Sequence, residues 1–228
     1  MGYVPLPMDE SRRPQIARLV RGPLENLYFR DVHDLLRLPQ REAGLGNGCD
    51  FAIARVLLSA VSTLSTALYA NGAGDGGYHS AFCNMLVRFY PWDTENEAPQ
   101  TEAKCQALAE ILWSEHRAAL DHPFGLWSDG PGGDTRSARE RGYAIRFRRI
   151  GGRDGNGLSE GDLERLERAT DWPFETFGQT LQVRENAPAV LKLERFYWGV
   201  RQAVLRMIAD WTLADRADAA LARQAEAG

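Results

Sequence analysis

The sequence has little lysine and little cysteine. Lysine occurs only at Lys104 and Lys192, so arginine supplies 25 of the 27 basic residues. The three cysteines, Cys49, Cys83 and Cys105, form no CxxC pair, and an odd number cannot all be bridged within one chain. Each lies in an apolar, helix-forming context, which is typical of small buried side chains. We therefore expect free thiols and a reducing, cytoplasmic compartment.

Signals for export, metal binding and nucleotide binding are also lacking. The first 23 residues hold no continuous apolar core of signal-peptide length. The four histidines include no i, i+4 pair and no HExxH motif, so we predict no metal and no cofactor. The glycine-rich stretch 72–77 lacks the Lys-Ser/Thr ending of a phosphate loop, and 154–157 lacks the outer ligands of a calcium loop. Each absence argues against a common class of ligand-dependent site.

Composition is that of an ordinary globular protein. The 228 residues are 44% hydrophobic and 25% charged, with a net charge of -4. This length can bury a substantial core as one large domain or two small ones. The negative net charge argues against a protein covered in positive charge, but it leaves room for a local basic patch.

Periodicity predicts a mainly helical protein, a bundle with a small two-stranded β insertion before the last helix. We expect an N-terminal arm over 1–23 and a single helical domain over 24–228. Apolar residues recur at helical spacing over 24–38, 51–70, 78–90 and 101–121. Segment 51–70 is apolar on nearly every face but contains Arg55 and small hydroxyl residues. We predict a helix buried by its neighbours there, rather than a membrane span.

Composition changes in an insertion at 129–186, which is rich in arginine and glycine. Alternating apolar residues near 143–148 and 180–184 predict two strands that pair as a ribbon. Asn186 and Pro188 have the residue types of a helix start, so we expect the C-terminal helix to occupy 187–228.

A basic cluster lies within this insertion. Between Arg136 and Arg153 there are seven arginines and one acid, Glu140, a local charge of +6. Arg146 and Arg148 share one face of the expected strand, and Arg149 follows. We name these three as candidate RNA-binding residues, because guanidinium groups bind phosphates well. A solvated strand face is the alternative.

A second feature is an Arg-x4-His pattern, Arg117 to His122, at the expected end of the helix over 101–121. Pro123 follows and disfavours helical geometry at His122. Glu115 lies seven residues before His122 and could orient it, or pair with an arginine of a neighbouring helix. A plain interaction of this His and Arg with the helix dipole is the alternative to catalysis.

With this motif at a helix end, residues 24–128 resemble the HEPN superfamily of helical bundles. The resemblance implies RNA binding or metal-independent RNA cleavage of the defence or toxin type, at a site formed in a homodimer. Carried over, His122 moves a proton at the ribose 2′-OH or the leaving oxygen, and Arg117 holds the phosphate. The sequence departs from the usual motif at Ala118, where family members carry a polar residue. A non-catalytic helical module for dimerisation or partner binding is the alternative function.

Overall fold

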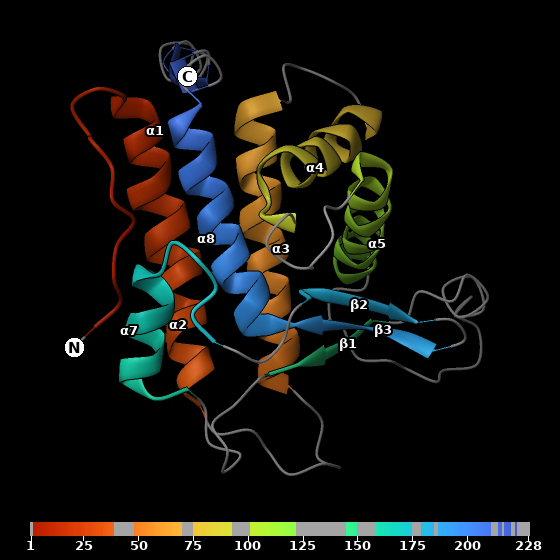
Figure 1. Ribbon diagram of the computed structural model, residues 1–228. Coiled ribbons are helices and arrows are strands. Elements are labelled where there is room, and N and C mark those ends of the chain that lie inside the picture. The colour runs from red at the N-terminus through yellow and green to blue at the C-terminus, as the bar shows by residue number, and fades with distance from the viewer. Residues whose placement is uncertain are drawn as a thin grey trace.

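The protein is a bundle of helices with a small sheet at one end (Figure 1). The computed structural model describes residues 2–38, 48–69, 75–92, 101–121, 145–149, 158–174, 179–184, 187–210, 214–215, 217–219 and 222. Two helices, α3 (Gly48–Tyr69) and α8 (Leu193–Ala209), run side by side through the bundle. Around them lie α2 (Arg30–Arg37), α4 (Asp75–Phe89), α5 (Glu102–Asp121) and α7 (Glu160–Arg168). The expectation of a mainly helical protein is confirmed.

The first helix begins earlier than the sequence analysis placed it. α1 (Pro14–Leu19) continues without a break through the π-helical segment η1 (Val20–Phe29) into α2. Pro14 stands in the first turn, where a missing N–H costs nothing. Pro23 lies inside η1, and a wider π-helical turn is a common way to absorb a local disturbance of the hydrogen-bond ladder. Residues 14–23 therefore belong to a helix, and the arm is limited to the residues before it.

The helix α3 supplies the centre of the core. It packs against α2, α4, α5, α8 and β1 (Ile145–Arg148), which explains why it is apolar on nearly every face. Its fully buried residues include Ile53, Leu57, Ala60 and Leu64. By length and composition alone, Cys49–Tyr69 is also apolar enough to cross a membrane.

The sheet differs from the expected two-stranded ribbon. In the described part of the chain three strands form it, in the order β1–β3–β2. The third strand, β3 (Ala187–Lys192), lies in the centre, parallel to β1 and antiparallel to β2 (Leu181–Arg184). The two predicted strands therefore exist but do not pair with each other. The C-terminal helix begins at Leu193, because the residues before it hydrogen-bond to both outer strands.

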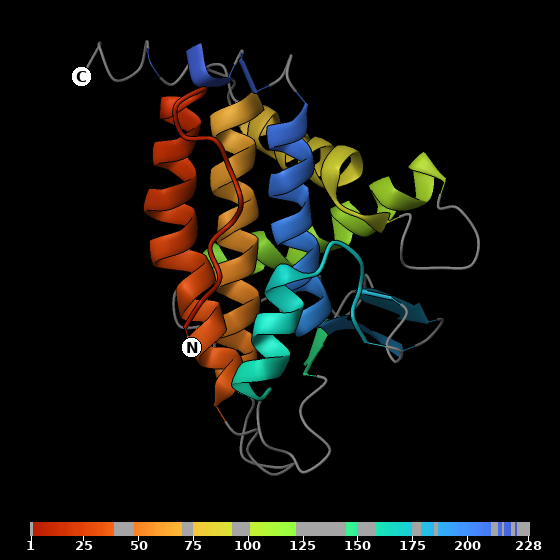
Figure 2. The ribbon, with the colours of Figure 1, turned by 60° about the vertical axis from the view of Figure 1, so that its left-hand side comes forward.

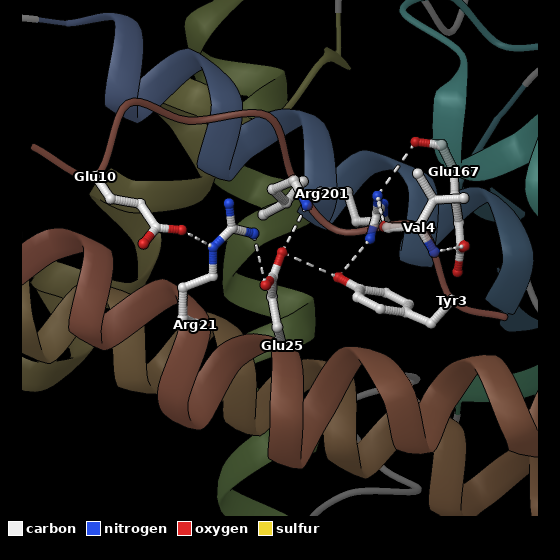
Figure 3. Close-up of polar contacts among 8 residues, drawn as sticks. Tyr3, Val4, Glu10, Arg21, Glu25, Glu167 and Arg201 are labelled. Atoms are coloured by element: carbon white, nitrogen blue, oxygen red, sulfur yellow. Dashed lines mark hydrogen bonds and ion pairs between the residues drawn. The ribbon is translucent and has the colours of Figure 1, made fainter.

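The N-terminal segment runs back along the bundle and is held by buried polar groups (Figures 2 and 3). The backbone N–H of Val4 donates to Glu167 of α7 over 2.8 Å. Arg201 of α8 donates to the carbonyl of Val4 and to the hydroxyl of Tyr3, both over 2.8 Å. Glu25 accepts from the N–H of Leu6. These contacts join residues from both ends of the chain.

Glu167 is the most heavily used acceptor in this network. Besides Val4, it accepts from the Tyr197 hydroxyl over 2.6 Å and from Nδ1 of His33 over 2.9 Å. A carboxylate can only accept, so Nδ1 of His33 carries the proton. Burial acts to raise the pKa of Glu167, but the His33 hydrogen bond, the Arg201 charge and the remaining donors outweigh it and hold the pKa below its usual value. The carboxylate therefore stabilises the fold in its charged form.

We predict that Glu167→Gln lowers the free energy of unfolding by about 3 kcal/mol at neutral pH, because Arg201 and three donors lose a buried anion. When folding lowers the pKa of a carboxyl group, the group stabilises the folded state at any pH above its unfolded-state pKa. This stabilisation is lost as the pH falls through the lower pKa of the folded state. The wild type should therefore lose stability below a pH of about 4.5, the usual pKa of the group, and more steeply than the variant.

Urea unfolding at a series of pH values measures both effects. Glu164→Gln on the same helix is the matched control, since the partner of Glu164 among the described residues is the exposed Arg168 one turn away, and it should change stability by less than about 0.5 kcal/mol. Equal, small effects of the two substitutions would contradict the assignment.

Candidate functional site

The helix α5 carries the predicted cleavage motif at its end. It begins after Thr101, whose hydroxyl accepts from the N–H of Lys104 over 3.3 Å, as expected of an N-cap. The backbone is helical from Glu102 to Asp121, which places Arg117 in the last described turns of α5. The side chains of Glu115 and Arg117, and all of His122, lie outside the described residues. Their mutual geometry therefore stays a prediction.

The arginines at β1 separate into different environments. Arg146 pairs with Val190 through its strand position, and its side chain lies outside the described atoms. Arg148 is exposed at the end of the strand. Arg149 is only 5% exposed, so its guanidinium does not belong to the RNA-binding surface that the sequence analysis assigned to it.

The reason is a buried ion pair. Nε of Arg149 lies 2.6 Å from Oδ1 of Asp50 in the first turn of α3. Arg149 also donates to the carbonyls of Leu35 and Leu38 at the end of α2. Burial raises the pKa of Asp50, although the charge of Arg149 acts to lower it. This pair joins the end of β1 to the junction between α2 and α3.

A cluster that the sequence analysis missed lies between α4 and α5. His79 and Cys83 stand one turn apart on α4, and Glu110 faces them from α5. Nε2 of His79 lies 2.5 Å from Oε2 of Glu110, and the cluster's donor atoms all lie within 4.8 Å of one another. The sequence signal for this cluster is His-x3-Cys, a mixed pair at helical spacing that a pattern of histidines alone does not include.

A hollow of about 660 Å³ lies beside this helix pair, between α4, the start of α5 and α8. Arg88, Glu102 and Arg206 contribute its charged side chains. Arg88 is already paired with Asp210 over 2.5 Å. The hollow therefore has mixed charge, and no one class of ligand matches it.

Comparison with known proteins gives no relative. No protein-family model matches the chain, and no curated protein or solved structure matches it. We therefore infer function from the residues and geometry of this chain alone.

We predict that Arg149→Ala destabilises the protein by about 3 kcal/mol, because it leaves the Asp50 carboxylate buried without its guanidinium partner and removes the donor to two part-buried carbonyls. Arg148→Ala should change stability by less than about 0.5 kcal/mol, since its side chain is exposed. Urea unfolding of the two neighbouring variants tests this contrast. Equal free energies of unfolding for the two variants would refute the structural role of Arg149.

Proposed function

We propose that the protein is a HEPN-like RNA-binding protein that cleaves RNA without a catalytic metal, through Arg117 and His122. The observation that supports this proposal is that α5 is helical as far as Asp121, the last residue described there, and that Pro123 follows two residues later in the sequence. On a continuous helix, residues five apart point about 140° away from each other. Because Pro123 disfavours helical geometry at His122, His122 would escape this restriction, and its ring could turn toward the phosphate held by Arg117.

The proposed chemistry needs only a base, an acid and a positive charge. His122 takes the proton of the ribose 2′-OH, the 2′ oxygen bonds to phosphorus, and the bond from phosphorus to the 5′ oxygen breaks. The leaving oxygen takes up a proton from water, which acts as the acid, and this gives a 2′,3′-cyclic phosphate and a 5′-OH end. Arg117 stabilises the negative charge that builds up on the phosphate, and Glu115 orients His122.

The RNA would lie against β1 rather than along the whole protein. A chain with net charge -4 gains little from its overall field when it approaches RNA, so a local cluster must supply the attraction. Arg148 is exposed on β1, an outer strand of the described sheet, and Arg146 lies two residues before it. With Arg149 committed to Asp50, the proposed contacts are Arg146 and Arg148.

The active form would be a homodimer. Trp113, Phe124 and Trp127 flank the motif in sequence and could anchor an interface there. A dimer brings two copies of Arg117 and His122 together, as the resemblance implies. Light scattering at micromolar concentration should then give twice the chain mass of 25.5 kDa.

We predict that the protein cuts total RNA in EDTA and that His122→Ala reduces the rate by at least a factor of about 100, because general acid–base catalysis contributes on this scale. His116→Ala is the matched control, a histidine of α5 six residues earlier in the sequence, and should keep the wild-type rate. Gel analysis of RNA over time measures both. A folded dimer that leaves RNA intact would instead favour the non-catalytic module.

We predict that Arg146→Glu/Arg148→Glu weakens RNA binding and flattens its dependence on salt. Each phosphate contact on single-stranded RNA contributes about 0.7 to the slope of log affinity against log salt, so losing two should reduce the slope by about 1.4. Arg165→Glu/Arg168→Glu on α7 is the matched control, since it makes the same charge change at two exposed residues. The same loss in both double variants would mean that net charge, and not the β1 surface, sets the affinity.

A further inference from the structure

The His79, Cys83 and Glu110 cluster joins three different donor types from two helices. The i, i+4 spacing on α4 puts His79 and Cys83 on one face, and α5 packs against that face. Cys83 is 1% exposed at the bottom of the cluster. The side chains of His79 and Glu110 are 38% and 42% exposed above it. The cluster therefore has an inner end within the core and an outer end open to solvent.

We propose that His79, Cys83 and Glu110 form a zinc-binding site that links α4 to α5. Thiolate, imidazole and carboxylate together are the ligands that zinc takes in proteins, whereas magnesium and calcium take oxygen ligands. Three protein ligands leave a fourth position for water, on the side of the cluster that faces solvent. The site lies outside the motif at the end of α5 and supplies no metal to the RNA chemistry.

The distances fit zinc after small movements of exposed side chains. Zinc bonds of about 2.0 to 2.3 Å place neighbouring donors of a tetrahedral site about 3.3 to 3.7 Å apart. Since all donor separations lie within 4.8 Å, none must close by more than about 1.5 Å, and the His79–Glu110 contact of 2.5 Å must open by about 1 Å. The side chains of His79 and Glu110, which are 38% and 42% exposed, are the ones with room to move, whereas Cys83 is buried.

Neighbouring side chains already orient two of the ligands. The amide of Gln106 donates to Oε1 of Glu110 over 2.8 Å, which leaves Oε2 directed at His79. The Trp113 ring packs against the imidazole of His79 at 5.3 Å between centroids. Such outer partners fix ligand orientation at metal sites.

Without a cation the cluster is a hydrogen-bonded group with a protonated thiol. Burial, and then the charge of Glu110, raise the pKa of Cys83 to about 12. Zinc must therefore displace the thiol proton, which passes to the buffer as the zinc–sulfur bond forms. No oxidation or other reactant is involved.

Titration of the full-length protein with zinc chloride, after removal of metal with a chelator, tests the site directly. A chromophoric chelator in competition should report one equivalent of zinc bound with submicromolar affinity, and the melting temperature should rise as zinc is added. Glu110→Gln and Cys83→Ser should each weaken binding by on the order of a hundredfold, since each removes a ligand. Cys105→Ser, at another buried cysteine on α5, is the matched control and should bind as the wild type does.

Cobalt substitution adds a readout that a merely stabilising role would not produce. Cobalt in the wild type and in Cys105→Ser should show a thiolate-to-metal absorption band, and Cys83→Ser should lose it. If Cys83→Ser does not fold, the zinc affinity of Glu110→Gln still tests the proposal, because Glu110 is half-exposed and its substitution should leave the fold intact. The absence of one-to-one binding tighter than about 10 μM, or binding unchanged in both variants, would overturn the proposal. No step of this test uses RNA, so it fails or succeeds independently of the proposed cleavage.

Discussion

A buried carboxylate, Glu167, connects the parts of the chain on which the rest of the structure depends. It accepts from Val4 near the N-terminus, from His33 on α2 and from Tyr197 on α8. Arg201, also on α8, supplies the opposite charge beside it. Burying this charge without partners would cost several kcal/mol, so the contacts are required together. They fix α2, α7 and α8 relative to one another, and α3 packs into the frame that results.

The packing of these helices positions both candidate functional regions, the arginines of β1 and the helix pair α4–α5. The strand β3 runs directly into α8, so the sheet is tied to the central helix by the chain itself. The Arg149–Asp50 pair ties the end of β1 to the start of α3, and the neighbouring Arg148 stays exposed. The helix α3 also packs against α4 and α5, which carry the proposed zinc ligands and, in the last described turns of α5, part of the proposed cleavage motif. Zinc would hold that helix pair together without taking part in the chemistry.

Local signals predicted the helices well, because amphipathic spacing and capping act within a few residues. The hydroxyl of Thr101 caps α5 as expected, and that of Ser159 caps α7 by accepting from Asp162. The start of the last helix was wrong, since Asn186 and Pro188 are typical of a helix start while pairing with two strands made the segment β3. The burial of Arg149 could not be predicted from local sequence either, because its partner Asp50 lies far away in the chain. Of the candidate site, the sequence supplies the motif residues and a helix predicted over 101–121, and the structure is helical from Glu102 to Asp121. The sequence alone does not predict that Glu110 lies beside His79 and Cys83, because this contact depends on how α4 packs against α5.

The most direct test of the account compares two RNA oligonucleotides of one sequence, one unmodified and one with every 2′-OH replaced by 2′-O-methyl. The proposed proton transfer by His122 requires the 2′-OH, whereas the proposed contacts of Arg146 and Arg148 are with phosphates, which both oligonucleotides share. The account predicts that the protein binds both with similar affinity in EDTA and cuts only the unmodified one, leaving a 2′,3′-cyclic phosphate. Cleavage of both oligonucleotides, or of neither while the protein is folded and RNA-bound, would contradict it.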